Sequence, residues 1–176
     1  MKRKFSSFFC PLLIFSILTA RYFSVAEAFQ TGVKLLLPVY VEKIETNSFS
    51  STARIRYHNF IPIKDLIDEA GVIVVRHFED GRVVFVSKEK GRKLHPREVL
   101  LQYIAVPSSL FRKEEQKPDV RFASSELRFS NNRPIEPSAV KYAIVCVNDR
   151  GKAFLTGLAD NSGTVLVKGL ASSRIF

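Results

Sequence analysis

The stretch 71–88, "GVIVVRHFEDGRVVFVSK", decides the fold class of this chain. Two runs rich in Val, Ile and Phe, at 72–78 and 82–87, flank the dipeptide Asp80-Gly81. Such runs around Asp-Gly are typical of a β-hairpin, in which these two residues supply the positive φ angles of a tight two-residue turn. The stretch therefore predicts two antiparallel strands.

Similar runs lie upstream of this hairpin. The segment 33–41, "VKLLLPVYV", predicts a strand with Pro38 at an edge or a bulge, because proline has no N–H to give to an inner ladder. The segment 52–57, "TARIRY", alternates small or apolar side chains with polar ones. We therefore expect a half-buried strand, with Ile55 and Tyr57 in the core and with Arg54 and Arg56 in water.

Downstream, "VKYAIVCVNDRGKAFLTGL" at 140–158 places the turn 148–151 between two strand-like runs, and "DNSG" at 160–163 leads into a third run. This pattern predicts a C-terminal meander. The apolar spacing of 99–106 fits a short helix as well as a strand, so that segment stays open. Polar loops are expected at 112–118 and 130–139.

The 176 residues, 46% of them hydrophobic, suffice for one compact domain with a core. The strand runs begin after a distinct N-terminal segment. We therefore predict a mainly β chain, in which one antiparallel β-sandwich or barrel-like domain at 29–176 follows an N-terminal membrane helix at 1–28.

The N-terminal segment, "MKRKFSSFFCPLLIFSILTA", has a basic head and an uncharged apolar run at 5–20, the layout of a membrane-targeting segment. Sixteen helical residues span about 24 Å, so an anchor would continue through 21–28. Alternatively, "AEA" at 26–28 fits a signal peptidase site, with cleavage after Ala28. Either interpretation places the N-terminus on the inner side of the cytoplasmic membrane and the body on the extracytoplasmic, periplasmic side. If the segment is not cleaved, the chain is a single-pass membrane protein.

Positive charge extends over the whole chain. The net charge is +10, and residues 29–176 hold 23 basic and 16 acidic residues, a net +7. Such a field favours anionic lipid, acidic polymers or nucleic acid. The run 88–93, "KEKGRK", offers a patch for anionic lipid, with a solvated turn as the alternative. The basic residues of this run are Lys88, Lys90, Arg92 and Lys93. Arginines beside phenylalanines in "VRFASSELRFS" at 120–130 are unspecific, and we expect no nucleic acid for an exported protein.

The usual signatures of catalysis are missing from the sequence: there is no Gly-x-Ser-x-Gly elbow, no His-Glu-x-x-His helix and no phosphate-binding glycine loop. His58, His77 and His95 are too widely spaced for a local metal motif. Cys146 lies in an apolar run and is expected to be a small buried hydrophobe. We therefore expect no enzyme, no cofactor and no metal, but a binding module whose partner is an envelope or membrane protein. The alternative is a secreted soluble domain, an enzyme or a ligand-binding protein, released after Ala28.

The apolar N-terminus, "TGVKLLLPV" at 31–39, "FSSTARIRY" at 49–57 and "AVKYAIVCVNDRGKAFLTGL" at 139–158 together resemble the GDYXXLXY family. These are small bacterial membrane-anchored proteins of unknown biochemical activity, so the resemblance implies an anchored envelope protein. The positions that fit the family pattern include Gly32, Pro38, Ile55, Tyr57, Tyr142, Asp149, Gly151 and Gly157. Ser50, Ser51 and Thr52 replace the Gly-Asp-Tyr of the family name, so no role of that aspartate carries over to this chain.

Overall fold

The computed structural model describes residues 31–62, 69–88, 91, 93–106, 119–132 and 134–170. The segment 1–28, with Cys10, and the loop 112–118 lie outside these residues. Ten strands are described: β1 (Val33–Thr46), β2 (Ser50–Tyr57), β3 (Ala70–His77), β4 (Val83–Lys88), β5 (Glu98–Val106), β6 (Asp119–Arg121), β7 (Glu126–Ser130), β8 (Tyr142–Val147), β9 (Ala153–Ala159) and β10 (Val165–Lys168). A 3-10 turn, η2 (Pro137–Ala139), precedes β8.

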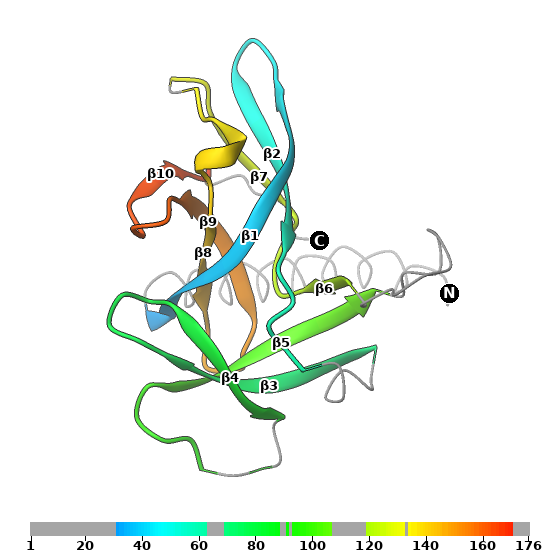
Figure 1. The fold of residues 1–176 in the computed structure, drawn as a ribbon, viewed down its shortest axis with the longest axis vertical. Coiled ribbons are helices and arrows are strands. Elements are labelled where there is room, and N and C mark those ends of the chain that lie inside the picture. The colour runs from blue at the N-terminus through cyan, green and yellow to red at the C-terminus, as the bar shows by residue number, and fades with distance from the viewer. Residues whose placement is uncertain are drawn as a thin grey trace, which may run out of the picture.

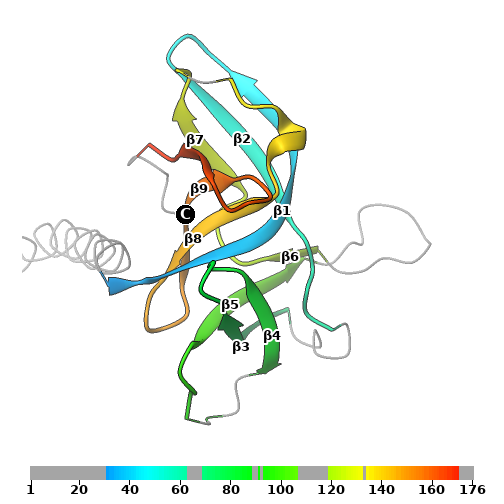
Figure 2. The same cartoon turned by 60° about the vertical axis from the view of Figure 1, so that its left-hand side comes forward.

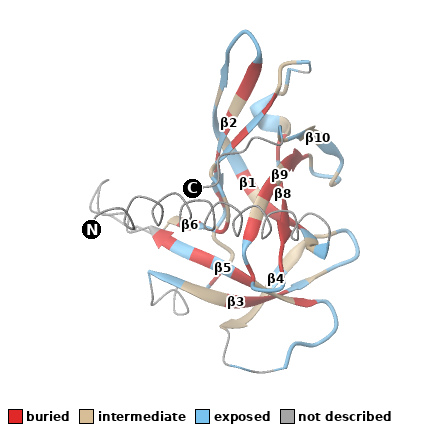
Figure 3. Cartoon of the chain, turned by 180° about the vertical axis from the view of Figure 1, so that it is seen from behind, coloured by how far each residue is buried: buried red, intermediate tan, exposed pale blue. Residues whose placement is uncertain are grey.

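The strands form two curled antiparallel sheets, as Figures 1 and 2 show. The larger sheet has the order β10-β9-β8-β1-β2-β7, and the smaller has the order β4-β3-β5-β6. One hydrophobic cluster contains residues of both sheets, among them Leu35, Ile55 and Phe129 of the larger and Ile73 and Leu101 of the smaller. The buried segments in Figure 3 lie along the strands of both sheets. The prediction of a mainly β chain is confirmed.

The hairpin predicted at 71–88 is confirmed as β3–β4, but its turn differs from the expectation. Phe78 N–H donates to the Arg82 carbonyl at 2.9 Å, and Gly81 N–H donates to the Phe78 carbonyl at 3.0 Å. Gly81 has a φ of +85°, whereas Asp80 is not among the described residues with positive φ. The expected two-residue turn is therefore wrong: the loop has three residues, with a turn followed by a glycine bulge.

The two turns of the C-terminal meander repeat this design. Gly151 N–H donates to the Asn148 carbonyl at 3.0 Å and Gly163 N–H to the Asp160 carbonyl at 3.1 Å. Like Gly81, both glycines have a positive φ, at +80° and +84°. The meander β8-β9-β10 predicted from the sequence is confirmed by the strand order.

The hairpin tips join the two sheets. Leu36 N–H of β1 donates to the Gly81 carbonyl of the β3–β4 tip at 2.8 Å. In the reverse direction, Gln102 N–H of β5 donates to the Gly151 carbonyl of the β8–β9 tip, also at 2.8 Å. Each sheet therefore bonds a turn glycine of the other sheet.

Pro38 lies where β1 changes partner. The β1–β8 ladder ends at Pro38, and the β1–β2 ladder begins at Val39. Val39 N–H donates to the Lys141 carbonyl, so by alternation the Pro38 nitrogen faces the β2 side, where no bond is yet required. Pro38 was predicted at an edge or a bulge, and neither is found: β1 is an inner strand, and its bulge lies between Val41 and Lys43. The missing N–H is tolerated for the same physical reason, because no ladder bond is required of it.

The open segment 99–106 belongs to strand β5. It pairs with β3 from Ala70↔Ile104 to Arg76↔Glu98, and its last three residues pair with β6. Leu101 is fully buried, while Ile104 on the opposite face is 58% exposed. Pairing with β3 on one side and with β6 on the other shows that this segment is a strand, whereas its apolar spacing alone fitted a helix as well.

Candidate binding groove between the two sheets

Strand β2 changes its neighbour partway along its length. Its ladder with β7 covers Ser50 to Arg54 and stops there. The next bond on that side joins Ile55 N–H to the carbonyl of Ser125, which belongs to the connection from β6 to β7. The end of β2 therefore faces β6 of the smaller sheet, and the two sheets meet along this line.

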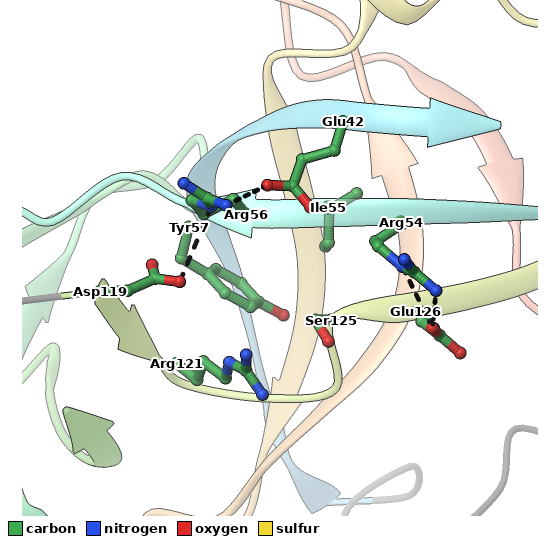
Figure 4. A pocket seen from close by; sticks show the side chains of 9 residues that line it. All are labelled: Glu42, Arg54, Ile55, Arg56, Tyr57, Asp119, Arg121, Ser125 and Glu126. Carbon is green, nitrogen blue, oxygen red and sulfur yellow. Dashed lines mark hydrogen bonds and ion pairs between the residues drawn. The ribbon is translucent and has the colours of Figure 1, made fainter. Parts of the chain in front are cut away.

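A pocket of about 380 Å³ lies at this meeting line (Figure 4). We call it the seam pocket. It is lined by Glu42, Arg54, Ile55, Arg56, Tyr57, Asp119, Arg121, Ser125 and Glu126. Three arginines and three carboxylates stand in this wall, so the pocket is charged but close to neutral as a whole.

Two of the arginines are held by carboxylates. Arg54 Nη2 lies 3.1 Å from Glu126 Oε1 across the β2–β7 ladder. Arg56 pairs with Glu42 and also reaches Asp119 Oδ2 at 3.7 Å, so it links β1 with β6. About half of each arginine side chain remains exposed, which leaves these pairs accessible to a ligand.

A β-bulge places Glu42 in this position. The β1–β2 register passes from Val41↔Ile55 to Lys43↔Arg54, so Glu42 is the extra residue of β1. Bulges re-aim a side chain relative to regular pleating. Here the bulge residue supplies the carboxylate that pairs with Arg56.

Arg121 is the third arginine, on the short strand β6 opposite Ile104 of β5. It is exposed, and among the described residues it makes no ion pair. Figure 4 shows its side chain directed along the β6–β7 connection toward Ser125. Its guanidinium therefore brings donors to the pocket that the described carboxylates do not use.

Tyr57 closes the inner side of the pocket. The whole residue is 3% exposed, and its ring meets the Phe122 ring edge-on, with centroids 5.7 Å apart. The hydroxyl donates to the Ser124 carbonyl at 2.9 Å. Burial raises the pKa of Tyr57 well above its ordinary value, so the phenol stays protonated in the folded chain.

Two serines at the start of β2 hold the β1–β2 hairpin against β7. Ser50 and Ser51 are buried. Ser51 Oγ donates to Asn131 Oδ1 at 2.6 Å, and Arg128 Nε donates to Ser50 Oγ at 2.8 Å. These bonds give both serines a structural part at the hairpin tip.

The remaining positions of the family pattern do not gather at the seam pocket. Gly32 precedes β1, and Asp149 is exposed in the β8–β9 turn. The half-buried Tyr142 begins β8, and its ring lies 5.3 Å below the Arg82 guanidinium. Ile55 and Tyr57 are the members of the set that line the pocket.

At two positions of the pattern, the conformation of the backbone or its close approach to a neighbouring strand explains why the residue is glycine. Gly151 occupies a positive φ, and a Cβ there would lie 3.0 Å from Leu100 Cβ. At Gly157 a Cβ would lie 2.6 Å from the Val167 carbonyl oxygen. Close backbone approach therefore requires glycine at both positions.

The predicted lipid patch is described in part. Lys88 ends β4 and is half-buried, and Lys93 is exposed. Lys90 and Arg92 lie outside the described residues. The patch therefore stays a prediction.

The other chemistry-bearing residues have ordinary surroundings. The His58 ring packs against Tyr40 with centroids 5.4 Å apart, and in the described part of the chain no three His, Cys, Asp or Glu side chains gather into a metal site. Cys146 is buried as expected, and its burial raises the pKa of the thiol. Phe122 and Phe129 are buried as well, so the aromatic rings of 120–130 face the core instead of a nucleic acid base.

Sequence reasoning identified Arg54 and Arg56 as an outward face but missed Glu42, Asp119, Arg121 and Glu126 as their neighbours. These residues come from three further strands between positions 42 and 126. No local pattern in the sequence signals that they meet.

No family model, no curated protein and no solved structure matches this chain. The resemblance to the GDYXXLXY family therefore stays a prediction. The described residues contain no helix of the length and apolarity needed to cross a membrane.

Proposed function

We propose that this chain is a membrane-anchored protein of the cell envelope and acts as a non-enzymatic binding module. In this proposal residues 1–28 form a membrane helix, and residues 29–176 form one barrel-like or sandwich β-domain of GDYXXLXY type on the extracytoplasmic side. The basic head and the apolar run 5–20 support the anchor. The partner is an envelope or membrane protein, with anionic lipid contacted through Lys88, Lys90, Arg92 and Lys93.

The seam pocket is the observation that carries the binding part of the proposal. Its charged groups are tied to one another in ion pairs on both flanks, with Arg121 left over among the described residues. A guanidinium stays protonated and offers planar pairs of donors, which suits recognition of a carboxylate or phosphate better than proton transfer. The pocket is therefore equipped to hold a charged partner.

Cleavage after Ala28 is the second candidate, favoured by "AEA" at 26–28. It would release a soluble secreted β-domain that binds a ligand or acts as an enzyme. Mass spectrometry of the membrane fraction separates the two: we expect peptides from upstream of Ala28. A major species that begins at Phe29 would refute retention of the anchor.

A cross-linking pull-down of the full chain from native membranes tests the binding function. We expect a defined envelope or membrane protein to be recovered in the covalent complex. Repeated recovery of the chain alone would contradict the proposed function.

A further inference from the structure

One half of the larger sheet consists of strand segments that contain no carboxylate. This half comprises residues 33–38 of β1 together with β8, β9 and β10. Lys34 of β1 lies opposite Cys146 of β8, which lies opposite Phe154 of β9, and ladder partners share a face of a sheet. Because the neighbouring Leu35 is fully buried in the core, Lys34 and Phe154 lie on the outer face.

Lys168 of the edge strand β10 belongs to the same outer face. It lies opposite Gly157 of β9, which lies opposite Ile144 of β8. Ile144 in turn lies opposite Leu36 of β1, two residues after Lys34. Residues two apart on a strand point to one side of the sheet, so the outer face carries lysines on both β1 and β10.

A third lysine, Lys152, stands over the aromatic ring between them. Its Nζ lies 5.4 Å from the centroid of the half-buried Phe154 ring. Lys34, Lys152 and Lys168 are exposed, and none of them has an ion pair in the part of the chain that the structure describes. We call these three lysines and Phe154 the lysine face. Lysines around an aromatic ring suit the level of lipid headgroups, where charged tips and apolar stems meet water and hydrocarbon.

The lysine face lies where the chain enters the domain. The proposed membrane helix ends at residue 28 and β1 begins at Val33, so residues 29–32 connect them. Even fully extended, this connection spans at most about 18 Å. The tip of the β1–β2 hairpin is remote from it, because the 14 residues of β1 extend about 45 Å. Figure 1 shows this tip at the top of the domain, away from the start of β1.

We infer that the lysine face docks on the anionic phospholipid headgroups of the membrane that anchors the chain. This inference rests on the proposed membrane anchor and names a surface separate from the run 88–93. The short connection favours lipid over an acidic polymer, because it holds Lys34 near the headgroups at a high effective concentration. By contrast Lys43, in the far half of β1, pairs with Glu45 at 2.9 Å. The unpaired lysines therefore orient the domain with its entry end toward the membrane.

Tryptophan fluorescence tests this docking on the full chain. The chain has no tryptophan, so Phe154→Trp places a single fluorophore in the lysine face. The protein is reconstituted in vesicles that contain a headgroup-spin-labelled lipid as quencher, in phosphatidylcholine alone or with phosphatidylglycerol added. We expect strong quenching with phosphatidylglycerol, weak quenching without it, and reversal by added salt. Phe49→Trp, at the 87% exposed tip position, should be quenched weakly in both.

Two pairs of lysine changes locate the charge in the same tryptophan reporter. Lys34→Gln with Lys168→Gln is compared with Lys43→Gln with Lys141→Gln, and each pair removes two exposed lysines. Each lysine near an anionic surface contributes about fivefold, so the first pair should lower the ratio of docked to undocked chain about 25-fold. The control pair should leave this ratio within about twofold.

Equal quenching in the two kinds of vesicle, equal quenching of the Phe49→Trp reporter, or an equal loss from both lysine pairs would overturn the inference. A larger fluorescence response to polyglutamate than to phosphatidylglycerol would assign the lysine face to an acidic polymer and overturn it as well. If Phe154→Trp does not fold, Val165→Trp repeats the test, because Val165 is 44% exposed on the same outer face.

Failure of this inference differs from failure of the proposed function. A chain that sediments with the vesicles but shows no quenching difference refutes docking of the lysine face alone. A chain that does not sediment with the vesicles lacks the anchor and refutes the proposed function.

Discussion

The two faces of β2 differ in burial, in polarity and in their contacts, although their residues alternate along one short segment. On the inner face Ala53, Ile55 and Tyr57 are at most 3% exposed and belong to the hydrophobic cluster shared by both sheets. On the outer face about half of the Arg54 and Arg56 side chains is exposed, and both pair with carboxylates of neighbouring strands. One short alternating segment therefore supplies core residues on one face and the paired arginines of the seam pocket on the other, and Ile55 and Tyr57 of the core face also line the inner side of that pocket.

The largest effect is expected on the inner face. Ile55→Ala removes a side chain that is 1% exposed and leaves a cavity in the shared cluster. We expect the free energy of unfolding to fall by about 2–5 kcal/mol. Urea unfolding of the full chain measures this, and an unchanged midpoint would mean that the face assignment is inverted.

Gly81→Val gives a scale for this loss at a site far along the chain from β2. Gly81 has a φ of +85°, and its carbonyl accepts the Leu36 N–H that ties the two sheets together. A β-branched residue resists positive φ, so we expect a loss of about 1–2 kcal/mol in the same urea experiment. A urea midpoint equal to that of the wild type would show that the turn tolerates the side chain and that the three-residue loop is wrong.

Tyr57→Phe sharpens the comparison, because Tyr57 contributes its ring to the core and its hydroxyl to the Ser124 carbonyl. Removal of one hydrogen bond is expected to cost about 0.5–1.5 kcal/mol near neutral pH. Thermal unfolding beside Ile55→Ala measures whether the hydroxyl matters less than the apolar side chain. A larger loss than that of Ile55→Ala would contradict the ranking.

The same variant carries a pH signature. Since burial raises the pKa of folded Tyr57, the unfolded chain loses this proton first, at pH values above about 10. Above that pH the unfolded state binds fewer protons than the folded state, so stability falls as pH rises. We expect a shallower fall for Tyr57→Phe than for the wild type; parallel curves would show that the tyrosine ionises equally in both states.

The smallest effect is expected on the outer face. Arg54→Ala breaks an exposed ion pair with Glu126, both side chains of which are more than half exposed. Exposed pairs contribute little, so the free energy of unfolding should change by at most about 0.5 kcal/mol. A loss as large as that of Ile55→Ala would make the outer face part of the core structure.

The sequence predicted this division of β2 because alternation is local. The hairpin β3–β4 and the meander β8–β10 could also be predicted from the sequence, since their turns carry glycine at a fixed place between apolar runs. The loop at Gly81 was predicted one residue too short. Asp-Gly is compatible with two turn types, and the closing bond from Phe78 to Arg82 decides between them.

The seam pocket could not be predicted in this way. β6 has only three residues, too few to show the alternation of polar and apolar side chains that marks a strand. Its contact with β2 depends on how the two sheets pack against each other, which no local pattern in the sequence indicates. Glu42 is the extra residue of a β-bulge in β1, and no glycine in the sequence marks this shift of register. The segment around Arg121 indicated an arginine–phenylalanine pattern, but Phe122 is buried while Arg121 is exposed.

The claim that the seam pocket is the partner site is tested most directly by photo-cross-linking in native membranes. A photoreactive amino acid is placed at position 125, which lines the seam pocket, in one full-length variant and at position 150, which does not, in another, so that Arg121 stays in place in both. We expect a covalent adduct with an envelope or membrane protein from position 125 and none from position 150. An adduct from position 150 alone, or from neither position, would contradict the account.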